Sequence, residues 1–210
     1  MNFSEIGILL IVIIGSVILH ELMHGVVAYW LGDRTAKEAG RLTLNPLKHI
    51  DPIMSILVPV LLFFTGGPVF GGAKPVPVNT RNLKGGAWGM ALVAIVGPLT
   101  NFLLAFIAFA VGHFSGVMYA PGLGRFAVLQ MISTNLGFFL FNILPIPPLD
   151  GSRVLYEIAP DGVRIWLEKI EKFGIIIIYA LLLIAGGFFS TYMGQGINGI
   201  YNWFYKIFGV

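Results

Sequence analysis

Residues 6–30 read IGILLIVIIGSVILHELMHGVVAYW, an apolar run long enough to cross a bilayer that nevertheless contains two histidines and a glutamate. On a helix, His20 and His24 of the pattern H-E-x-x-H lie one turn apart on one face, where both can bind one zinc ion. Glu21 lies beside them as a candidate base toward water at the metal. Ionisable residues inside a span are costly and therefore candidates for function. The alternative is a polar trio that joins helices by hydrogen bonds.

The composition places the chain among multi-span membrane proteins. Of its 210 residues, 57% are hydrophobic and only 11% are charged, whereas soluble domains contain about 25% charged residues. The absence of cysteine excludes disulfides, thiol catalysis and cysteine-bound zinc. The net charge of +3 comes from Lys and Arg in loops, which indicates membrane topology and no nucleic-acid partner.

Four segments have the length and hydropathy of membrane spans: approximately 6–31, 88–112, 126–144 and 173–190. The apolar segment 53–65 would form a helix of only ~20 Å, which is too short to span. Proline and glycine in the following stretch 66–79, GGPVFGGAKPVPVN, favour extended and turning backbone. The tail 194–210 mixes aromatic and polar residues and is typical of an interfacial helix or a weak last span.

The distribution of Lys and Arg predicts the topology. If 53–65 does not cross, the segments 32–87, 113–125 and 145–172 contain seven, one and four cations, and the tail contains one. This alternation follows the positive-inside rule. We therefore expect a multi-pass protein of the cell membrane with its N-terminus outside and 32–87 and 145–172 in the cytoplasm. The predicted fold is an all-α polytopic bundle of four to six transmembrane helices, with a small β-hairpin or re-entrant element at 53–87 near the cytoplasmic face.

A catalytic zinc usually has three protein ligands and one open position. The best third candidate is Asp150, in the segment NILPIPPLDG at 142–151. Its prolines end the preceding helix and force extended backbone, so the aspartate can be turned back into the bundle. A turn aspartate before Gly151 is the alternative. We expect His49 and His113 to be interfacial or solvated.

Several spaced motifs together resemble the site-2 protease family of intramembrane zinc metalloproteases. That family pairs HExxH on one span with N-x-x-P-x-P-x-x-D-G on a later one, as H-E-L-M-H and 142–151 do here. The stretch GPLTN at 97–101 resembles the G-P-x-x-N of the span between them. The stretches GRLTLNP at 40–46 and KPVPVN at 74–79 resemble the hairpin region on the cytoplasmic side. The resemblance runs over about 7–155 in the right order.

The resemblance implies roles for six residues. It implies one Zn2+ per chain with three ligands: His20, His24 and Asp150. Glu21 would be the general base and then the acid. Asn101 and Asn142 would be accessory polar residues, and Asn142 could support a developing oxyanion. Interhelical hydrogen bonding is the alternative for both asparagines.

The resemblance also implies a single membrane-embedded metalloprotease domain over 1–210, with a catalytic core at about 7–155 and C-terminal helices at about 160–210. Its reaction would be hydrolysis of a peptide bond within or near a transmembrane segment of a membrane-protein substrate, as in regulated intramembrane proteolysis. Many family members carry an extra span before HExxH and PDZ or CBS domains. This chain looks like a minimal member, controlled by its own core or by a separate regulatory partner.

Two other functions fit an H-E-x-x-H pattern in a span. A divalent-metal transporter would place further His, Asp or Glu ligands in adjacent spans, but the other predicted spans contain almost no ionisable residues. A non-catalytic membrane zinc protein is the third option, and Glu21 argues against it because structural zinc needs no free carboxylate there. The sequence indicates neither the substrate nor the oligomeric state.

Overall fold

The computed structural model of the chain describes residues 1–65 and 71–209, and its regular structure in these ranges is helical. The helices are α1 (Phe3–Trp30), α2 (Thr35–Glu38), α3 (Val58–Thr65), α4 (Gly86–Phe114), α5 (Leu123–Asn142), α6 (Asp150–Ile158), α7 (Asp161–Glu171), α8 (Gly174–Ile184) and α9 (Gly186–Phe208). Single turns of 3-10 helix occur at Pro46–Lys48 and Thr80–Asn82, and a π-helical turn at Pro52–Leu57 leads into α3.

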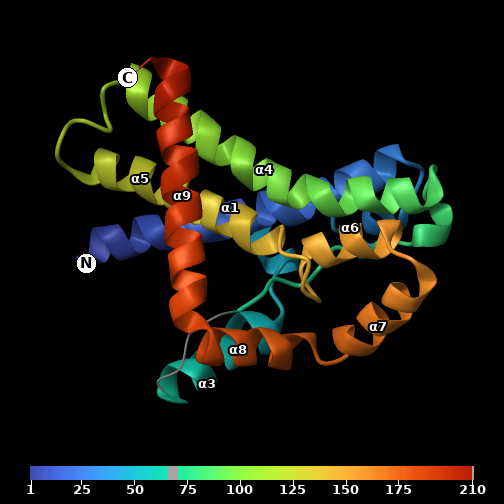
Figure 1. The fold of residues 1–210 in the computed structure, drawn as a ribbon. Coiled ribbons are helices and arrows are strands. Elements are labelled where there is room, and N and C mark those ends of the chain that lie inside the picture. Colours follow the sequence, from blue (N-terminus) through green and yellow to red (C-terminus); the bar gives the residue numbers. More distant parts are fainter. Residues whose placement is uncertain (66–70, 210) are drawn as a thin grey trace.

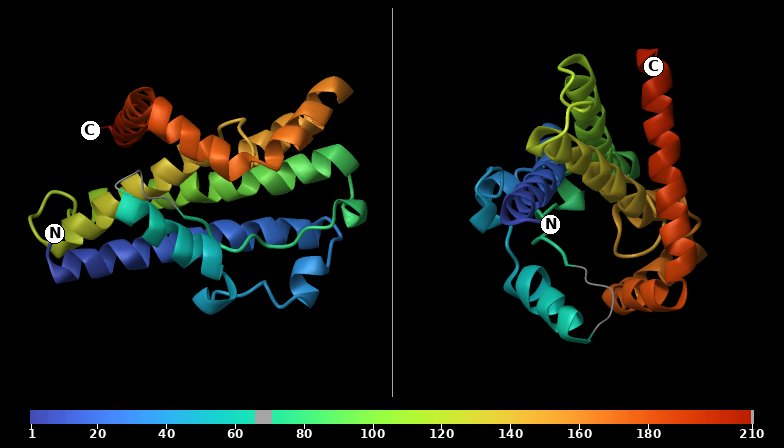
Figure 2. Two further views of the ribbon diagram at one scale, coloured as in Figure 1. Left: turned by 90° about the horizontal axis from the view of Figure 1, so that it is seen from below. Right: turned by 90° about the vertical axis from the view of Figure 1, so that its left-hand side faces the viewer.

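The helices α1, α4 and α5 form the central bundle. They pack against one another and run side by side (Figure 1 and Figure 2). Each is long and apolar enough to cross a membrane. The three predicted spans 6–31, 88–112 and 126–144 therefore correspond to three helices, with boundaries that differ by a few residues.

The predicted span at 173–190 is wrong as a continuous helix. The chain breaks at Ala185, and α8 and α9 are bent by 90° relative to each other. Gly186 and Gly187 follow the break, and glycine is a poor helix former. The predicted number of four to six spans is met only at its lower limit, and only if this bent pair counts as one span.

Residues 194–208 of the tail are a continuous part of α9, which crosses the central bundle (Figure 1). Phe204 of α9 is fully buried against Phe109 of α4 and Leu136 of α5. Between apolar helices in a bilayer, close van der Waals packing of this kind holds the helices together. This aromatic contact fixes α9 across α4 and α5.

The predicted β-hairpin is absent from the described part of 53–87. Helix fills 52–65, residues 66–70 of the predicted element lie outside the described residues, and 71–79 is non-helical without strand pairing. Two residues of 71–79, Pro75 and Pro77, have no backbone N–H and cannot donate a hydrogen bond to a neighbouring strand. We name 71–79 the strap, because it runs along α1 (Figure 2).

The backbone of the strap bonds to separate parts of the chain. The N–H of Gly72 donates to the carbonyl of Met54 over 3.1 Å, and the N–H of Lys74 donates to the carbonyl of His49 over 2.8 Å. Arg41 donates to the carbonyl of Lys74 over 2.7 Å. The strap is therefore fixed by the loop between α2 and α3.

Asp33, just after α1, fastens the other end of the strap. Its side chain is fully buried and accepts hydrogen bonds from the backbone N–H of Asn79, the hydroxyl of Thr35 and the side chain of Asn82. Burial alone would raise the pKa of Asp33, but these hydrogen bonds outweigh it and hold the pKa of the carboxyl below its ordinary value. No sequence motif predicts this role for Asp33.

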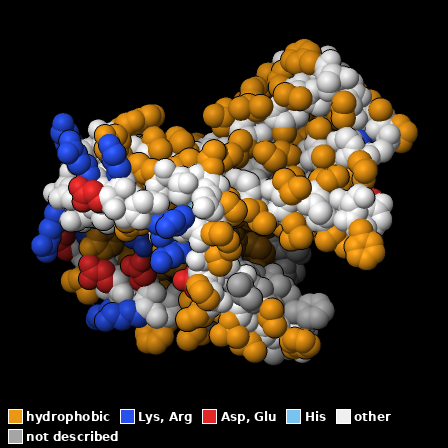
Figure 3. Space-filling view, turned by 180° about the vertical axis from the view of Figure 1, so that it is seen from behind, with side chains coloured by type: hydrophobic (Ala, Val, Ile, Leu, Met, Phe, Trp, Pro, Cys, Tyr) orange, Lys and Arg blue, Asp and Glu red, His pale blue; other side chains and the backbone are white. Residues whose placement is uncertain are grey.

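Charged side chains gather at the end of the molecule where α1 ends and α4 begins (Figure 3). The exposed cations Arg34, Lys37 and Lys84 belong to this end. The other parts of this face are mainly apolar (Figure 3). This separation is typical of a helical membrane protein, and the side to which each end faces stays a prediction.

Replacing Asp33 with asparagine should destabilise the protein by about 1–3 kcal/mol at pH 7, because an amide would turn a donor toward a buried N–H, hydroxyl or amide donor. Unfolding by denaturant in detergent micelles measures the loss. A carboxyl with a lowered pKa stabilises the fold above its unfolded-state pKa of about 3.9, and this contribution fades as the pH falls through the folded-state pKa. The difference between Asp33→Asn and wild type should therefore shrink below about pH 4. A difference that is equal at neutral and acidic pH would contradict this role.

Candidate metal centre

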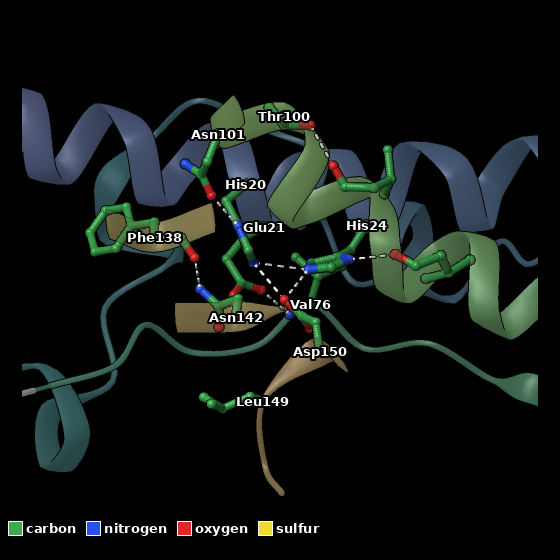
Figure 4. A network of polar contacts seen from close by, with 12 residues as sticks. His20, Glu21, His24, Val76, Thr100, Asn101, Phe138, Asn142, Leu149 and Asp150 are labelled. Carbon is green, nitrogen blue, oxygen red and sulfur yellow. Dashed lines mark hydrogen bonds and ion pairs between the residues drawn. The ribbon is translucent and has the colours of Figure 1, made fainter. Parts of the chain in front are cut away.

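His20, His24 and Asp150 converge on one buried point between α1, α4 and α6 (Figure 4). The Nε2 atoms of the two histidines are 3.1 Å apart. The Oδ2 atom of Asp150 lies 3.0 Å from Nε2 of His20 and 3.5 Å from Nε2 of His24. Both histidines are buried, with 7% and 8% of their surface exposed. Two residues of α1 thus meet a residue 126 positions further along the chain than His24.

The outer nitrogens of both imidazoles are engaged. Nδ1 of His20 lies 2.6 Å from Oδ1 of Asn101, and Nδ1 of His24 lies 2.6 Å from the backbone carbonyl of Val93. A carbonyl oxygen can only accept, so each neutral imidazole carries its proton on Nδ1. Each Nε2 then has a free lone pair.

The three inward-facing atoms are therefore all electron-pair donors when the imidazoles are neutral. Two imidazole nitrogens and a carboxylate oxygen at 3.0–3.5 Å, without a proton among them, repel one another in a buried place. A divalent cation removes this repulsion. Nitrogen and carboxylate oxygen are ligands that zinc accepts, and outer hydrogen bonds of this kind orient histidine ligands. The residues present fit a zinc ion.

The close approach of α4 depends on Gly97. A Cβ atom at this position would lie closer than 3.0 Å to Nε2 of both His20 and His24. Any side chain here would occupy the space into which the two nitrogens point. Glycine at this position therefore keeps the metal side of the histidines open.

Asp150 reaches the histidines because the chain turns sharply after α5. Asp150 is the first residue of α6, which packs on α4. A Cβ atom on the next residue, Gly151, would collide with the backbone carbonyls of Ile143 and Leu144. Gly151 thus allows α6 to begin directly against the end of α5. The structure brings Asp150 to the histidine pair, and its role as a ligand remains a prediction.

Glu21 lies between the two histidines in sequence and faces the strap. Its Oε2 atom accepts a hydrogen bond of 3.0 Å from the backbone N–H of Val76 (Figure 4). Its Oε1 atom accepts no hydrogen bond from the described residues. The carboxylate is thus held by one oxygen, which leaves the other available to take a proton.

The two asparagines predicted as accessory residues lie in different surroundings. Asn101 is fully buried and contacts His20, and its amide nitrogen donates to Asn135 over 2.8 Å. Asn142 donates to the carbonyl of Phe138 in its own helix over 3.0 Å. Asn101 therefore orients a histidine. The oxyanion role of Asn142 stays a prediction.

Asn135 and Ser16 continue the hydrogen bonds behind Asn101 and were not predicted as site residues from the sequence. Both are fully buried polar residues within apolar spans. That position was the only signal of function available in the sequence, because polar side chains inside spans are exceptional.

His49 and His113 are separate from the metal group. His49 is 3% exposed and hydrogen-bonds the carbonyl of Thr43, so the expectation that it is solvated is wrong, and an interfacial position stays a prediction. It is covered because the loop after α2 folds against the strap. His113 lies near the end of α4 with its Nδ1 atom 2.7 Å from the hydroxyl of Tyr119. Neither histidine can complete the site.

Fold and site together define a helical membrane protein with a buried group of two histidines and one aspartate. The chain is 40% identical over 209 residues to the Bacillus subtilis (strain 168) protein named "Putative zinc metalloprotease YwhC", and the alignment covers 95% of this chain and 92% of that protein. It is 30% identical over 221 residues to "Putative zinc metalloprotease Rip2" of Mycobacterium tuberculosis (strain ATCC 25618 / H37Rv), with 97% and 76% covered. The chain belongs to the zinc metalloprotease family of these proteins.

A third relative is "Putative zinc metalloprotease Rip2" of Mycolicibacterium smegmatis (strain ATCC 700084 / mc(2)155), which is 29% identical over 216 residues. This alignment covers 99% of the chain and 77% of the relative. No family model matches the chain, and no solved structure matches it with significance.

Replacing Gly97 with alanine should weaken zinc binding by about tenfold or more, because the methyl group would crowd both Nε2 atoms. Competition against a zinc chelator measures the affinity. Gly15→Ala is the matched control, since Gly15 lies in α1 with nothing within 4 Å of its Cβ position. Equal zinc affinity in Gly97→Ala and wild type would show that the metal does not bind at this point.

Proposed function

We propose that the chain is an intramembrane zinc endopeptidase of the site-2 protease type. Its substrate is another membrane protein, in which it hydrolyses a peptide bond within or near a transmembrane segment. The convergence of the Nε2 atoms of His20 and His24 with Oδ2 of Asp150 carries this proposal. The burial of this group among apolar helices and the names of the relatives support it.

Zinc, when bound, supplies a Lewis acid that polarises a carbonyl and acidifies water. His20, His24 and Asp150 would hold it. The Oε1 atom of Glu21 would take a proton from the attacking water while Val76 keeps the other oxygen in place. Glu21 would then return this proton to the nitrogen of the leaving amine. The new C–O bond and the broken C–N bond thus require one proton transfer in each direction at Glu21.

The substrate must reach this site in an extended conformation, because hydrogen bonds within a helix shield its peptide bonds. The strap passes beside Glu21 and offers backbone groups for pairing with such a segment.

A transport function gains no support from the described residues. Within residues 1–65 and 71–209, one group of three His, Asp or Glu side chains could hold a metal ion. A transporter would need further ligands along a path through the membrane. A non-catalytic zinc protein would need no free carboxylate, yet Glu21 keeps one oxygen free.

Glu21→Gln should abolish proton transfer while leaving zinc bound. Glutamine keeps an oxygen that can accept from Val76, so the fold of the site is preserved. Loss of a general base lowers the rate by roughly 10²–10⁴-fold. Cleavage of a single-span model substrate in proteoliposomes, with zinc content measured on the same samples, tests this.

If Glu21→Gln cleaves the substrate at the wild-type rate, Glu21 is not the base. If neither protein cleaves any span and both carry zinc across liposomes, the transport function is correct.

Val76→Pro removes the N–H that holds Glu21, in a stretch where proline already stands on both sides. We expect a roughly 10–100-fold loss of cleavage rate from the mispositioned carboxylate, with zinc affinity unchanged. Ala73→Pro is the control, because the N–H of Ala73 makes no hydrogen bond with the described residues. Equal rates for Val76→Pro, Ala73→Pro and wild type would show that the strap does not position the base.

A further inference from the structure

Behind His20, on the side away from Asp150, three fully buried polar side chains form a chain of hydrogen bonds. They come from three helices: Ser16 from α1, Asn101 from α4 and Asn135 from α5. Nδ2 of Asn135 donates to Oγ of Ser16 over 2.8 Å, and Nδ2 of Asn101 donates to Oδ1 of Asn135 over 2.8 Å. This series of hydrogen bonds ends at Nδ1 of His20.

The amide of Asn135 can take only one orientation in this place. Its Nδ2 atom also lies 2.8 Å from the backbone carbonyl of Met131, one turn earlier in α5. A backbone carbonyl accepts and never donates. If the amide were reversed, two oxygens would face each other in an apolar interior without water, which costs free energy. Oδ1 of Asn135 must therefore face Asn101.

This direction is passed on to the histidine. Because Oδ1 of Asn135 accepts, Nδ2 of Asn101 must donate, and Oδ1 of Asn101 is turned toward His20. His20 must then donate from Nδ1. Its Nε2 atom is then unprotonated, and the lone pair on this atom is directed at the metal position.

We propose that Asn135 is a positioning residue that fixes the tautomer of His20 through Asn101, and that the carbonyl of Met131 sets the direction. The inference rests on the proposed function, because only a metal at Nε2 makes this tautomer matter. His24 achieves the same end directly, through the carbonyl of Val93. Both histidines thus take their tautomer from a backbone carbonyl, which cannot reverse.

A purely structural role would make Asn135 a link between helices and nothing more. The two roles differ in what they predict for metal-free His20. A link between helices affects stability alone. A directional relay also determines which imidazole nitrogen carries the proton.

Nitrogen-15 NMR of histidine-labelled protein, metal-free in micelles at about pH 8, reads the tautomer of His20 directly. Zinc affinity is measured on the same samples by chelator competition. The first variant is Asn135→Leu, which replaces the amide by an apolar side chain of similar size. The second is Ser16→Ala, in which the carbonyl of Met131 still fixes the orientation of the Asn135 amide. Ser133→Ala is the control on α5, because among the described residues Ser133 donates its side-chain hydrogen bond only to the carbonyl of Gln130 in its own helix.

We expect the Nδ1–H form of His20 in wild type, Ser16→Ala and Ser133→Ala. Asn135→Leu should show a mixture of tautomers and a zinc affinity lower by about 10–100-fold, as for other residues that orient a metal ligand. Asn135→Leu with the wild-type tautomer and wild-type zinc affinity overturns the proposal, even if its stability is reduced.

If Asn135→Leu does not fold, the spectrum of the wild-type protein is still a test. An Nε2–H form of His20 in metal-free wild type would also overturn the proposal that Asn135 fixes the tautomer. The proposed function can fail separately. Wild-type protein that binds zinc with the Nδ1–H tautomer but cleaves no membrane substrate would leave the relay intact and remove the protease.

Discussion

Two imidazole nitrogens and a carboxylate oxygen face one another across 3.0–3.5 Å, and all three are electron-pair donors when the imidazoles are neutral. This convergence of electron-pair donors is the constraint on which the rest of the structure depends. Apolar surroundings give the three atoms little screening from one another, so the arrangement is favourable only around a cation. The outer hydrogen bonds of both histidines maintain it, because they keep the protons on the far nitrogens.

The fold supplies the closeness that this arrangement needs. Gly97 lets α4 approach the two histidines, and Gly151 lets α6 begin against the end of α5. The strap closes the remaining side and holds Glu21 by one oxygen. The contacts of Gly97 with the histidines and of the strap with Glu21 join segments far apart in the chain, so the site forms only when the bundle is assembled.

The sequence predicted the parts of the site more fully than the fold around it. H-E-x-x-H on an apolar run and an aspartate after a proline-rich stretch were sufficient to single out the three residues that the structure brings together. The length and hydropathy of the apolar runs also located α1, α4 and α5. These signals are local, because a helix face and a proline break are determined by neighbouring residues.

The rest depended on contacts that one sequence does not contain. The break at Ala185 lies in an apolar run whose hydropathy alone resembled a span. The strap looked like a hairpin, because proline and glycine indicate extended backbone but not whether a second strand pairs with it. Asn135 and Asp33 belong to no motif that was recognised in the sequence. Their importance comes from partners 34 and 46 residues away.

X-ray absorption at the zinc edge of the purified wild-type protein measures whether the two histidines and the aspartate bind zinc. We expect one zinc per chain bound by nitrogen and oxygen only, with two imidazoles and metal–nitrogen distances of about 2.0–2.1 Å. We also expect the imidazole signal to fall when His20 or His24 is replaced by alanine. A protein without bound zinc, or a zinc shell of oxygen atoms without imidazole, would show that these side chains do not form a zinc site.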